Sequence, residues 1–232
     1  MFHGKMKALT FSYDDGVTQD RQLLRILEKY DLRATFNLNS GLFGEAHAFF
    51  DERKNVTFPH VRFRASEIAG RYAGHEVAAH TRTHAELQTL SDEEVLAEVE
   101  LDRKALSEIC GYDVTGFAYP FGTAAATDRV RRLLQTGTGI RYARTTTSTH
   151  AFALPEDPLL WHPTARHAEK DALLRLGEQF LALDARTPQV FLLWGHSYEF
   201  ERDDDWDRFD AFCRLMSRRG DIFYGTMREI FP

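Results

Sequence analysis

Short apolar runs alternate with stretches of helical periodicity along almost the whole chain. The runs that we expect to be strands are 7–11, 34–38, 76–79, 114–119, 140–144, 159–162, 190–194 and 222–224. Strands that alternate with helices in this way are typical of βα units, which build parallel sheets. The pattern predicts an α/β fold with seven or eight strands, either a barrel or a doubly wound sheet.

The stretches between these runs carry apolar residues at spacings near 3.6 and begin and end with recognisable signals. Helices are expected at 21–30, 91–109, 127–135, 169–183 and 206–218. Ser91 and Glu94 form a capping box, and Gly111 provides the stop for the same helix. The segment 41–65 is less regular and predicts an excursion from the sheet or barrel. Without an internal repeat or a linker, we expect a single domain over 1–232.

Charge and cysteine content exclude several classes of protein. The chain has 232 residues with 35 acidic and 29 basic side chains, so nothing favours binding to nucleic acid or to an anionic membrane. Its two cysteines, Cys110 and Cys213, provide neither a zinc motif nor a disulfide framework. No segment resembles a secretory signal or a membrane helix, so we expect a cytoplasmic protein. The oligomeric state is not indicated.

Two adjacent carboxylates, Asp14 and Asp15, follow the first expected strand. Ligands gather at the carboxyl ends of parallel strands in both candidate folds. Neighbouring side chains on a strand point to opposite faces, so the pair can share one site only if the chain turns there. Gly16 permits such a turn. A polar strand end without function is the alternative interpretation.

Histidines follow two further strands. His80 and His84 come directly after 76–79, and two imidazoles at this spacing can hold a divalent metal together with a carboxylate. The spacing also occurs by chance. His196 follows the apolar run 190–194 and has the pKa range of a proton donor near neutrality, although an isolated histidine is often structural. The common position of these motifs at strand ends favours a site.

At this point the sequence resembles the polysaccharide deacetylase, or NodB-homology, family. SYDDG at 12–16 matches the first family motif, and HTRTH at 80–84 matches the second. YPFG at 119–122 and the apolar run ending in His196 match the third and fifth motifs less fully. The resemblance covers most of the chain. It implies a distorted, incomplete (β/α) barrel, in agreement with the strand count.

The resemblance also implies roles for the motif residues. Asp15, His80 and His84 would bind one divalent metal ion, with zinc expected and cobalt or nickel as alternatives. Asp14 would be the general base and His196 the general acid. The implied reaction is hydrolysis of the acetyl amide of an N-acetylated sugar or oligosaccharide, in which the metal activates the attacking water.

Other motif residues would support this chemistry. Thr81 would brace the loop that carries the histidines through a hydrogen bond. The backbone N–H of Tyr119, next to Pro120 and Phe121 in the third motif, would bind the developing oxyanion.

Two family features are not found at their usual places. The third motif often has an arginine that pairs with the base, but Ala118 occupies that position, and the aspartate of the fourth motif cannot be placed. Residues that could substitute for them are His162, Arg166, His167 and Glu199, with Trp161 and Trp194 as rings that could stack on a sugar. A solvated loop, a surface carboxylate and core packing are the alternative interpretations of these residues.

Two other functions remain open at this stage. A hydrolase of a non-sugar C–N bond would use the same metal chemistry and differ only in its pocket. A non-catalytic carbohydrate-binding barrel is a different class, although binding alone needs no general base beside a metal.

Overall fold

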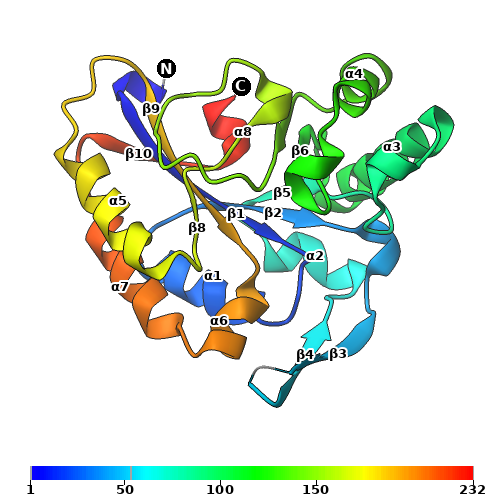
Figure 1. The fold of residues 1–232 in the computed structure, drawn as a ribbon, viewed down its shortest axis with the longest axis horizontal. Coiled ribbons are helices and arrows are strands. Elements are labelled where there is room, and N and C mark those ends of the chain that lie inside the picture. The colour runs from blue at the N-terminus through cyan, green and yellow to red at the C-terminus, as the bar shows by residue number, and fades with distance from the viewer. Residues whose placement is uncertain (1, 53, 232) are drawn as a thin grey trace.

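The computed structural model describes residues 2–52 and 54–231, which form an α/β fold around one curled parallel sheet (Figure 1). The strands are β1 (Lys7–Asp14), β2 (Ala34–Leu38), β3 (Ala46–Asp51), β4 (Val56–Val61), β5 (Glu76–Ala79), β6 (Gly116–Ala118), β7 (Tyr142–Arg144), β8 (Ala165–Arg166), β9 (Gln189–Gly195) and β10 (Ile222–Tyr224). The sheet runs in the order β7-β6-β5-β2-β1-β9-β8, with β10 paired to β1. The expectation of an incomplete (β/α) barrel is confirmed.

Most of the helices pack on the outer face of this sheet. The helices are α1 (Asp20–Lys29), α2 (Ala65–Arg71), α3 (Asp92–Cys110), α4 (Asp128–Gly137), α5 (Lys170–Ala182), α6 (Ser197–Asp203), α7 (Trp206–Met216) and α8 (Met227–Ile230). Helix α8 instead packs its Met227 and Ile230 side chains in a separate buried cluster with Ala8 and Leu192. In Figure 1, α3 and α4 lie together near β5 and β6. Helices α5 and α7 lie side by side on the opposite side of the molecule. In the described residues, no helix is long and apolar enough to cross a membrane.

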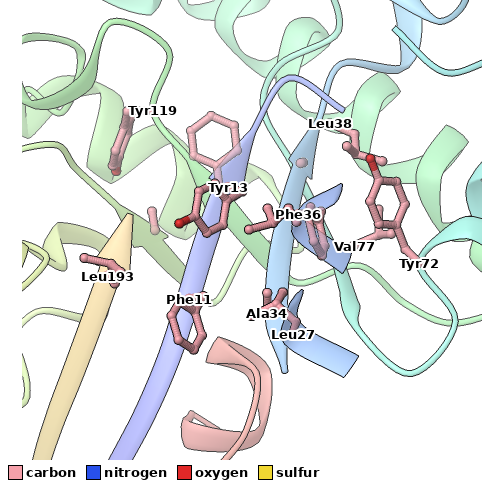
Figure 2. Close-up of a cluster of buried hydrophobic side chains, with 14 of the residues drawn as sticks. Phe11, Tyr13, Leu27, Ala34, Phe36, Leu38, Tyr72, Val77, Tyr119 and Leu193 are labelled. Atoms are coloured by element: carbon pink, nitrogen blue, oxygen red, sulfur yellow. The ribbon is translucent and has the colours of Figure 1, made fainter. Parts of the chain in front are cut away.

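Strand β1 lies at the centre of the sheet and is buried along its whole length. Its outward side chains, Leu9, Phe11 and Tyr13, belong to the main hydrophobic core between the sheet and the helices, where Tyr13 is in register with Phe36 of β2 (Figure 2). The alternate residues of β1 are polar toward its carboxyl end. The strand is therefore buried on both faces, with apolar side chains toward the helices and the buried polar side chains Thr10, Ser12 and Asp14 on the opposite face.

Most strand predictions are confirmed, but the one at 159–162 is wrong. Residues Pro158–Leu160 form a 3₁₀ helix instead, in which Asp157 accepts a hydrogen bond from the Leu159 N–H at 2.8 Å. A proline at the start of a helical turn has no N–H to leave unsatisfied, so it favours this turn over a strand. The strand that pairs with β9 lies slightly later, at Ala165–Arg166.

The irregular segment 41–65 does leave the sheet, as expected. Its central part is the antiparallel hairpin β3–β4, which projects from the body of the molecule in Figure 1. A bridge between Val17 and Arg62 joins the base of this hairpin to the turn that follows β1. The hairpin base therefore lies against the carboxyl end of the central strand.

Candidate active site

The chain turns sharply directly after β1. Asp15 has φ 79° and Gly16 has φ 66°, both in the left-handed region, and Asp15 N–H donates to the carbonyl of Asn37 at 3.0 Å. A Cβ added at Gly16 would lie 2.6 Å from the Leu38 side chain, so this position requires glycine. The turn lets the side chains of Asp14 and Asp15 approach the same site although they are adjacent in sequence.

Asp15, His80 and His84 come together as a group that can hold a metal ion. One ligand atom from each lies within 4.8 Å of the other two. His80 Nδ1 is 2.8 Å from the carbonyl of Ala118, which acts as acceptor and leaves Nε2 with a free lone pair. Burial, together with His80, lowers the pKa of His84 to about 4, so its imidazole is neutral at pH 7. Two neutral imidazoles and a carboxylate suit a divalent ion such as zinc.

The loop that carries both histidines is held from several sides. Thr81 has φ 61°, and its Oγ1 accepts a hydrogen bond from Ala85 N–H at 3.0 Å, the bracing contact expected from the sequence. Asn39 donates to the carbonyl of Thr81 at 2.9 Å. On the other side, the buried carboxylate of Asp102 on α3 accepts the N–H of His80 at 2.9 Å. These contacts fix a strained backbone, as is common at functional sites.

Asp14 has a cationic partner, Arg144, at the end of β7. Arg144 Nη2 lies 2.6 Å from Asp14 Oδ2, and Arg144 Nε donates to Ser12 Oγ at 2.9 Å. Burial by itself would raise the pKa of Asp14, but the charge and hydrogen bond of Arg144, together with His80 and His196, outweigh it, and the pKa falls below its usual value. Asp14 is therefore ionised at neutral pH. The expectation that it lacks an arginine because of Ala118 is wrong.

His196 faces Asp14 from the end of β9. Its Nε2 lies 3.9 Å from Asp14 Oδ2, and its Nδ1 lies 3.6 Å from Glu199 Oε2 on α6. Burial would lower the pKa of His196, but the nearby Glu199 carboxylate raises it above its usual value. Glu199 also contacts His167 Nε2 at 3.1 Å and pairs with Arg166. Glu199 therefore provides a carboxylate beside His196, the role for which the fourth-motif aspartate could not be placed.

A cavity of about 530 Å³ opens between these groups. Its lining includes Asp14, His80, His84, Phe121, Arg166, Trp194 and His196. Arg166 and Trp194 both line the cavity, which is one of the positions that the sequence allowed for them. The Arg166 guanidinium lies 5.3 Å from the Trp194 ring centroid.

The remaining candidates of the segment 161–167 lie elsewhere. Trp161 is buried against Phe231 at a ring distance of 4.8 Å, and His162 Nδ1 lies 2.6 Å from Thr145 Oγ1. Neither belongs to the residues that line the cavity. His167 is buried outside the cavity lining, and it contacts the site through Glu199 and through its backbone N–H, which donates to the carbonyl of Trp194 at 2.9 Å.

The third motif contributes differently from the expectation. Tyr119 N–H already donates to the carbonyl of Arg144 at 3.1 Å as part of the sheet, so it is not free to bind an oxyanion. After Pro120, which has no N–H, the next backbone donor is Phe121, with φ 58°. Within residues 2–52 and 54–231, Phe121 N–H donates no hydrogen bond. The Phe121 ring contacts His84 at 4.8 Å and is 55% exposed.

Sequence reasoning missed three charged or titratable residues around the two aspartates. Arg144 could have been found, because the strand prediction 140–144 already placed it at a carboxyl end. His60 Nε2 and Arg62 Nη2 on β4 lie 3.2 and 3.1 Å from the Asp15 carboxylate. No sequence signal points to these two residues, because they come from the irregular segment.

Comparisons with known proteins agree with this geometry. A family model described as polysaccharide deacetylase matches residues 3–143. No curated protein sequence matches the chain significantly.

Among solved structures, three with similar folds are described as carbohydrate esterases or polysaccharide deacetylases, one of them a pseudoenzyme. A family 4 acetyl xylan esterase from Clostridium thermocellum in complex with a cobalt ion matches with 13% identity, 97% coverage of this chain, 90% of the other and a TM-score of 0.59. A CE4 family pseudoenzyme from Bacillus anthracis matches with 20% identity, 98% and 66% coverage and a TM-score of 0.59. A polysaccharide deacetylase from Bacillus cereus matches with 22% identity, 65% coverage of this chain and a TM-score of 0.50.

This chain spans 44% of the length of the Bacillus cereus protein. At these identities, the structural matches establish the fold, while the match of the family model covers more than half of the chain. The matched residues 3–143 include the turn at Asp14–Gly16 and the pair His80 and His84. The chain therefore belongs to the polysaccharide deacetylase family.

Proposed function

We propose that this protein is a metal-dependent hydrolase that removes the acetyl group from an N-acetylated sugar or oligosaccharide. The observation that carries the proposal is the cavity in which an ionised carboxylate, Asp14, faces a histidine with a raised pKa, His196. Two titratable groups whose pKa values are pushed apart in one cavity are the arrangement that general acid–base catalysis needs.

The donor set of Asp15, His80 and His84 fits a divalent metal ion, for which we expect zinc. A bound ion would supply Lewis-acid chemistry, polarising the acetyl carbonyl and lowering the pKa of water. Asp102 and the carbonyl of Ala118 orient the loop and the ring of His80 from behind. Such outer contacts fix the tautomer and the direction of a ligand.

The chain's own residues move the protons. Asp14, held ionised by Arg144, takes a proton from the water that attacks the acetyl carbon. His196, held protonated by Glu199, gives its proton to the nitrogen that leaves. The C–N bond breaks, and acetate and a free amine are released, so the proton taken at Asp14 balances the one given by His196.

Negative charge develops on the acetyl oxygen during the attack, and a backbone donor near the cavity can stabilise it. We assign this role to Phe121 N–H in place of Tyr119, whose N–H is engaged in the sheet. The exposed Phe121 ring and the Trp194 ring at the cavity provide apolar faces for a sugar.

Acetate release tests the proposal directly. The protein loaded with zinc or cobalt is incubated with N-acetylglucosamine and its β-1,4-linked oligosaccharides, with and without a chelator. We expect chelator-sensitive release of acetate, which Asp14→Asn abolishes and Glu201→Gln, a matched change on the exposed side of α6, leaves intact.

The alternatives predict other outcomes. Metal binding without acetate release from any sugar, but with hydrolysis of non-sugar amides, would move the proposal to another C–N substrate. Sugar binding without any hydrolysis would favour a non-catalytic barrel.

A further inference from the structure

The buried face of strand β4 carries polar side chains. Phe58 and His60 of β4 are buried, and so is Arg62 directly after the strand, whereas the alternate residues Thr57 and Pro59 are exposed. Residues two apart on a strand point to the same face, so His60 and Arg62 both point into the molecule. Burying a histidine and an arginine costs free energy unless each has a polar partner.

Both side chains have the same partner, the carboxylate of Asp15. His60 Nε2 lies 3.2 Å from Asp15 Oδ2, and Arg62 Nη2 donates to Asp15 Oδ1 at 3.1 Å. Within residues 2–52 and 54–231, His60 Nδ1 has no partner, so the His60 ring forms its hydrogen bond with Asp15 alone. The hairpin β3–β4 therefore supplies one donor to each oxygen of a side chain that belongs to the candidate metal-binding group.

Backbone pairing builds this arrangement into the fold. The stretches 16–18 and 61–63 run antiparallel, with Val17 opposite Arg62. Two backbone hydrogen bonds between these stretches, 2.8 and 3.0 Å long, flank this bridge. The backbone of Arg62 is thus fixed next to the turn that carries Asp15.

Arg62 also reaches the loop that carries the two histidines of the site. Its Nη2 lies 3.5 Å from Asn39 Oδ1, and Asn39 Nδ2 in turn donates to the carbonyls of His80 and Thr81. Asn39 is fully buried. The Arg62 guanidinium therefore connects the turn with Asp15 to the loop with His80, and the relative position of these two segments sets the distances between the ligand atoms.

These contacts leave lone pairs on Asp15 for a metal ion. Each carboxylate oxygen has two lone pairs, so an oxygen that accepts one hydrogen bond can still bind an ion. Outer hydrogen bonds of this kind fix the direction of a ligand, and their loss typically weakens metal binding by about 10- to 100-fold. The alternative is a purely structural role at the hairpin base, which would affect folding stability and leave metal affinity unchanged.

We propose that His60 and Arg62 are positioning residues for Asp15, through which the hairpin β3–β4 sets the affinity of the site for its divalent metal ion. His60 orients one carboxylate oxygen. Arg62 holds the other oxygen and ties the turn to the histidine loop through Asn39. The inference rests on the metal site of the proposed function and adds two residues that act through Asp15 rather than on the ion itself.

Zinc titrations by calorimetry test this role. We expect His60→Leu and Arg62→Met to weaken zinc binding by about 10- to 100-fold. His60→Gln, whose side-chain amide can donate in place of Nε2, should restore most of the affinity. Arg62→Lys keeps the charge but has no fork with which to contact Asp15 and Asn39 together, so its affinity should stay low.

The hairpin offers a matched control. His47 is exposed and lies opposite His60 in the hairpin register, so His47→Leu should bind zinc as wild type does. Urea unfolding with a chelator shows that each variant is folded. A lower free energy of unfolding with unchanged zinc affinity in His60→Leu and Arg62→Met would leave only the structural role and overturn the proposal.

Two further results separate positioning from a direct effect on the ion. His60 acts through Asp15, so His60→Leu should not weaken zinc binding further in the background of Asp15→Asn. A further loss in that background would show that His60 binds the ion itself, and the proposal would be wrong. Tighter zinc binding by Arg62→Met would also overturn it, because the guanidinium would then oppose the ion.

Metal binding and activity can fail separately. If wild type binds zinc, and both variants bind it more weakly, but no acetate is released from any sugar, the proposed function fails and the positioning role stands. Chelator-sensitive acetate release together with wild-type zinc affinity in both variants would overturn the positioning role alone. A wild-type protein that binds no zinc would overturn both.

Discussion

Arg144 and Asp14 form a buried ion pair across the interior of the barrel, with Nη2 2.6 Å from Oδ2 and at most 4% of either side chain exposed. Strands β6, β5 and β2 separate β7 from β1, so the pair exists because the sheet is curled. Arg144 is in register with Ala118 of β6, and paired residues of parallel strands point to the same face. Because the Ala118 side chain is small, it leaves room for the guanidinium of Arg144, which extends from the neighbouring strand β7.

Removing the arginine should destabilise the protein strongly. Arg144→Ala leaves the Asp14 carboxylate buried without its cation, and we expect the free energy of unfolding to fall by about 3–5 kcal/mol. In the background of Asp14→Asn, the same change should cost clearly less, because no charge is left unpaired. Urea denaturation of the four proteins measures this coupling, with Arg141→Ala as an exposed control. Equal costs in both backgrounds would show that the ion pair contributes nothing.

The two adjacent aspartates should separate in a metal titration. Asp15→Asn removes a ligand, so we expect the affinity for zinc in calorimetry to fall by more than about 100-fold. Asp14→Asn leaves the ligand set complete and should change the affinity far less while abolishing acetate release. If Asp15→Asn binds zinc as tightly as wild type, the ligand assignment is wrong.

Replacing Glu199 should shift the pH dependence of the reaction. The Glu199 carboxylate raises the pKa of His196, so the general acid keeps its proton to higher pH than an ordinary histidine. Glu199→Gln lowers that pKa, and the basic limb of the kcat/KM profile should move to lower pH while the acid limb stays in place. Glu201→Gln on the same helix is the control. A basic limb that stays at the wild-type pH would exclude His196 as the acid that Glu199 tunes.

Asp20 should make stability depend on pH. Burial raises the pKa of this carboxyl to about 7 in the folded protein, where it accepts a hydrogen bond from Tyr72 Oη at 2.6 Å. In the unfolded chain the group titrates near its ordinary value, so between about pH 4 and 7 the folded state holds the extra proton. Its contribution to stability is therefore complete at low pH and is lost as pH rises, by at most about 1.4 kcal/mol per pH unit.

The variant Asp20→Asn cannot titrate, so its stability relative to wild type should improve from pH 5 to pH 7.5. Denaturant unfolding at both values measures the change, and Asp31→Asn, at an exposed position, should show no such trend. A constant difference between Asp20→Asn and wild type at the two pH values would contradict the raised pKa.

Much of the fold could be read from local patterns. The strands at 34–38, 76–79 and 222–224 have the expected bounds, because short runs rich in β-branched, aromatic and other apolar residues favour strands. The run at 159–162 misled because Pro158 and Asp157 favour a 3₁₀ turn at an apolar sequence. Local turn chemistry outweighed the apolar composition there.

The candidate site divides in the same way. Sequence by itself determined the turn at Asp15 and Gly16, the histidine pair at 80 and 84, and the position of His196 after a buried strand, because these depend on residues that are close in the chain. Only the tertiary structure decided that Arg144 serves Asp14, that Glu199 serves His196, and that β4 brings His60 and Arg62 to Asp15. The curl of the sheet and the path of the hairpin set these contacts, and both result from the packing of segments far apart in sequence, on which local periodicity carries no information.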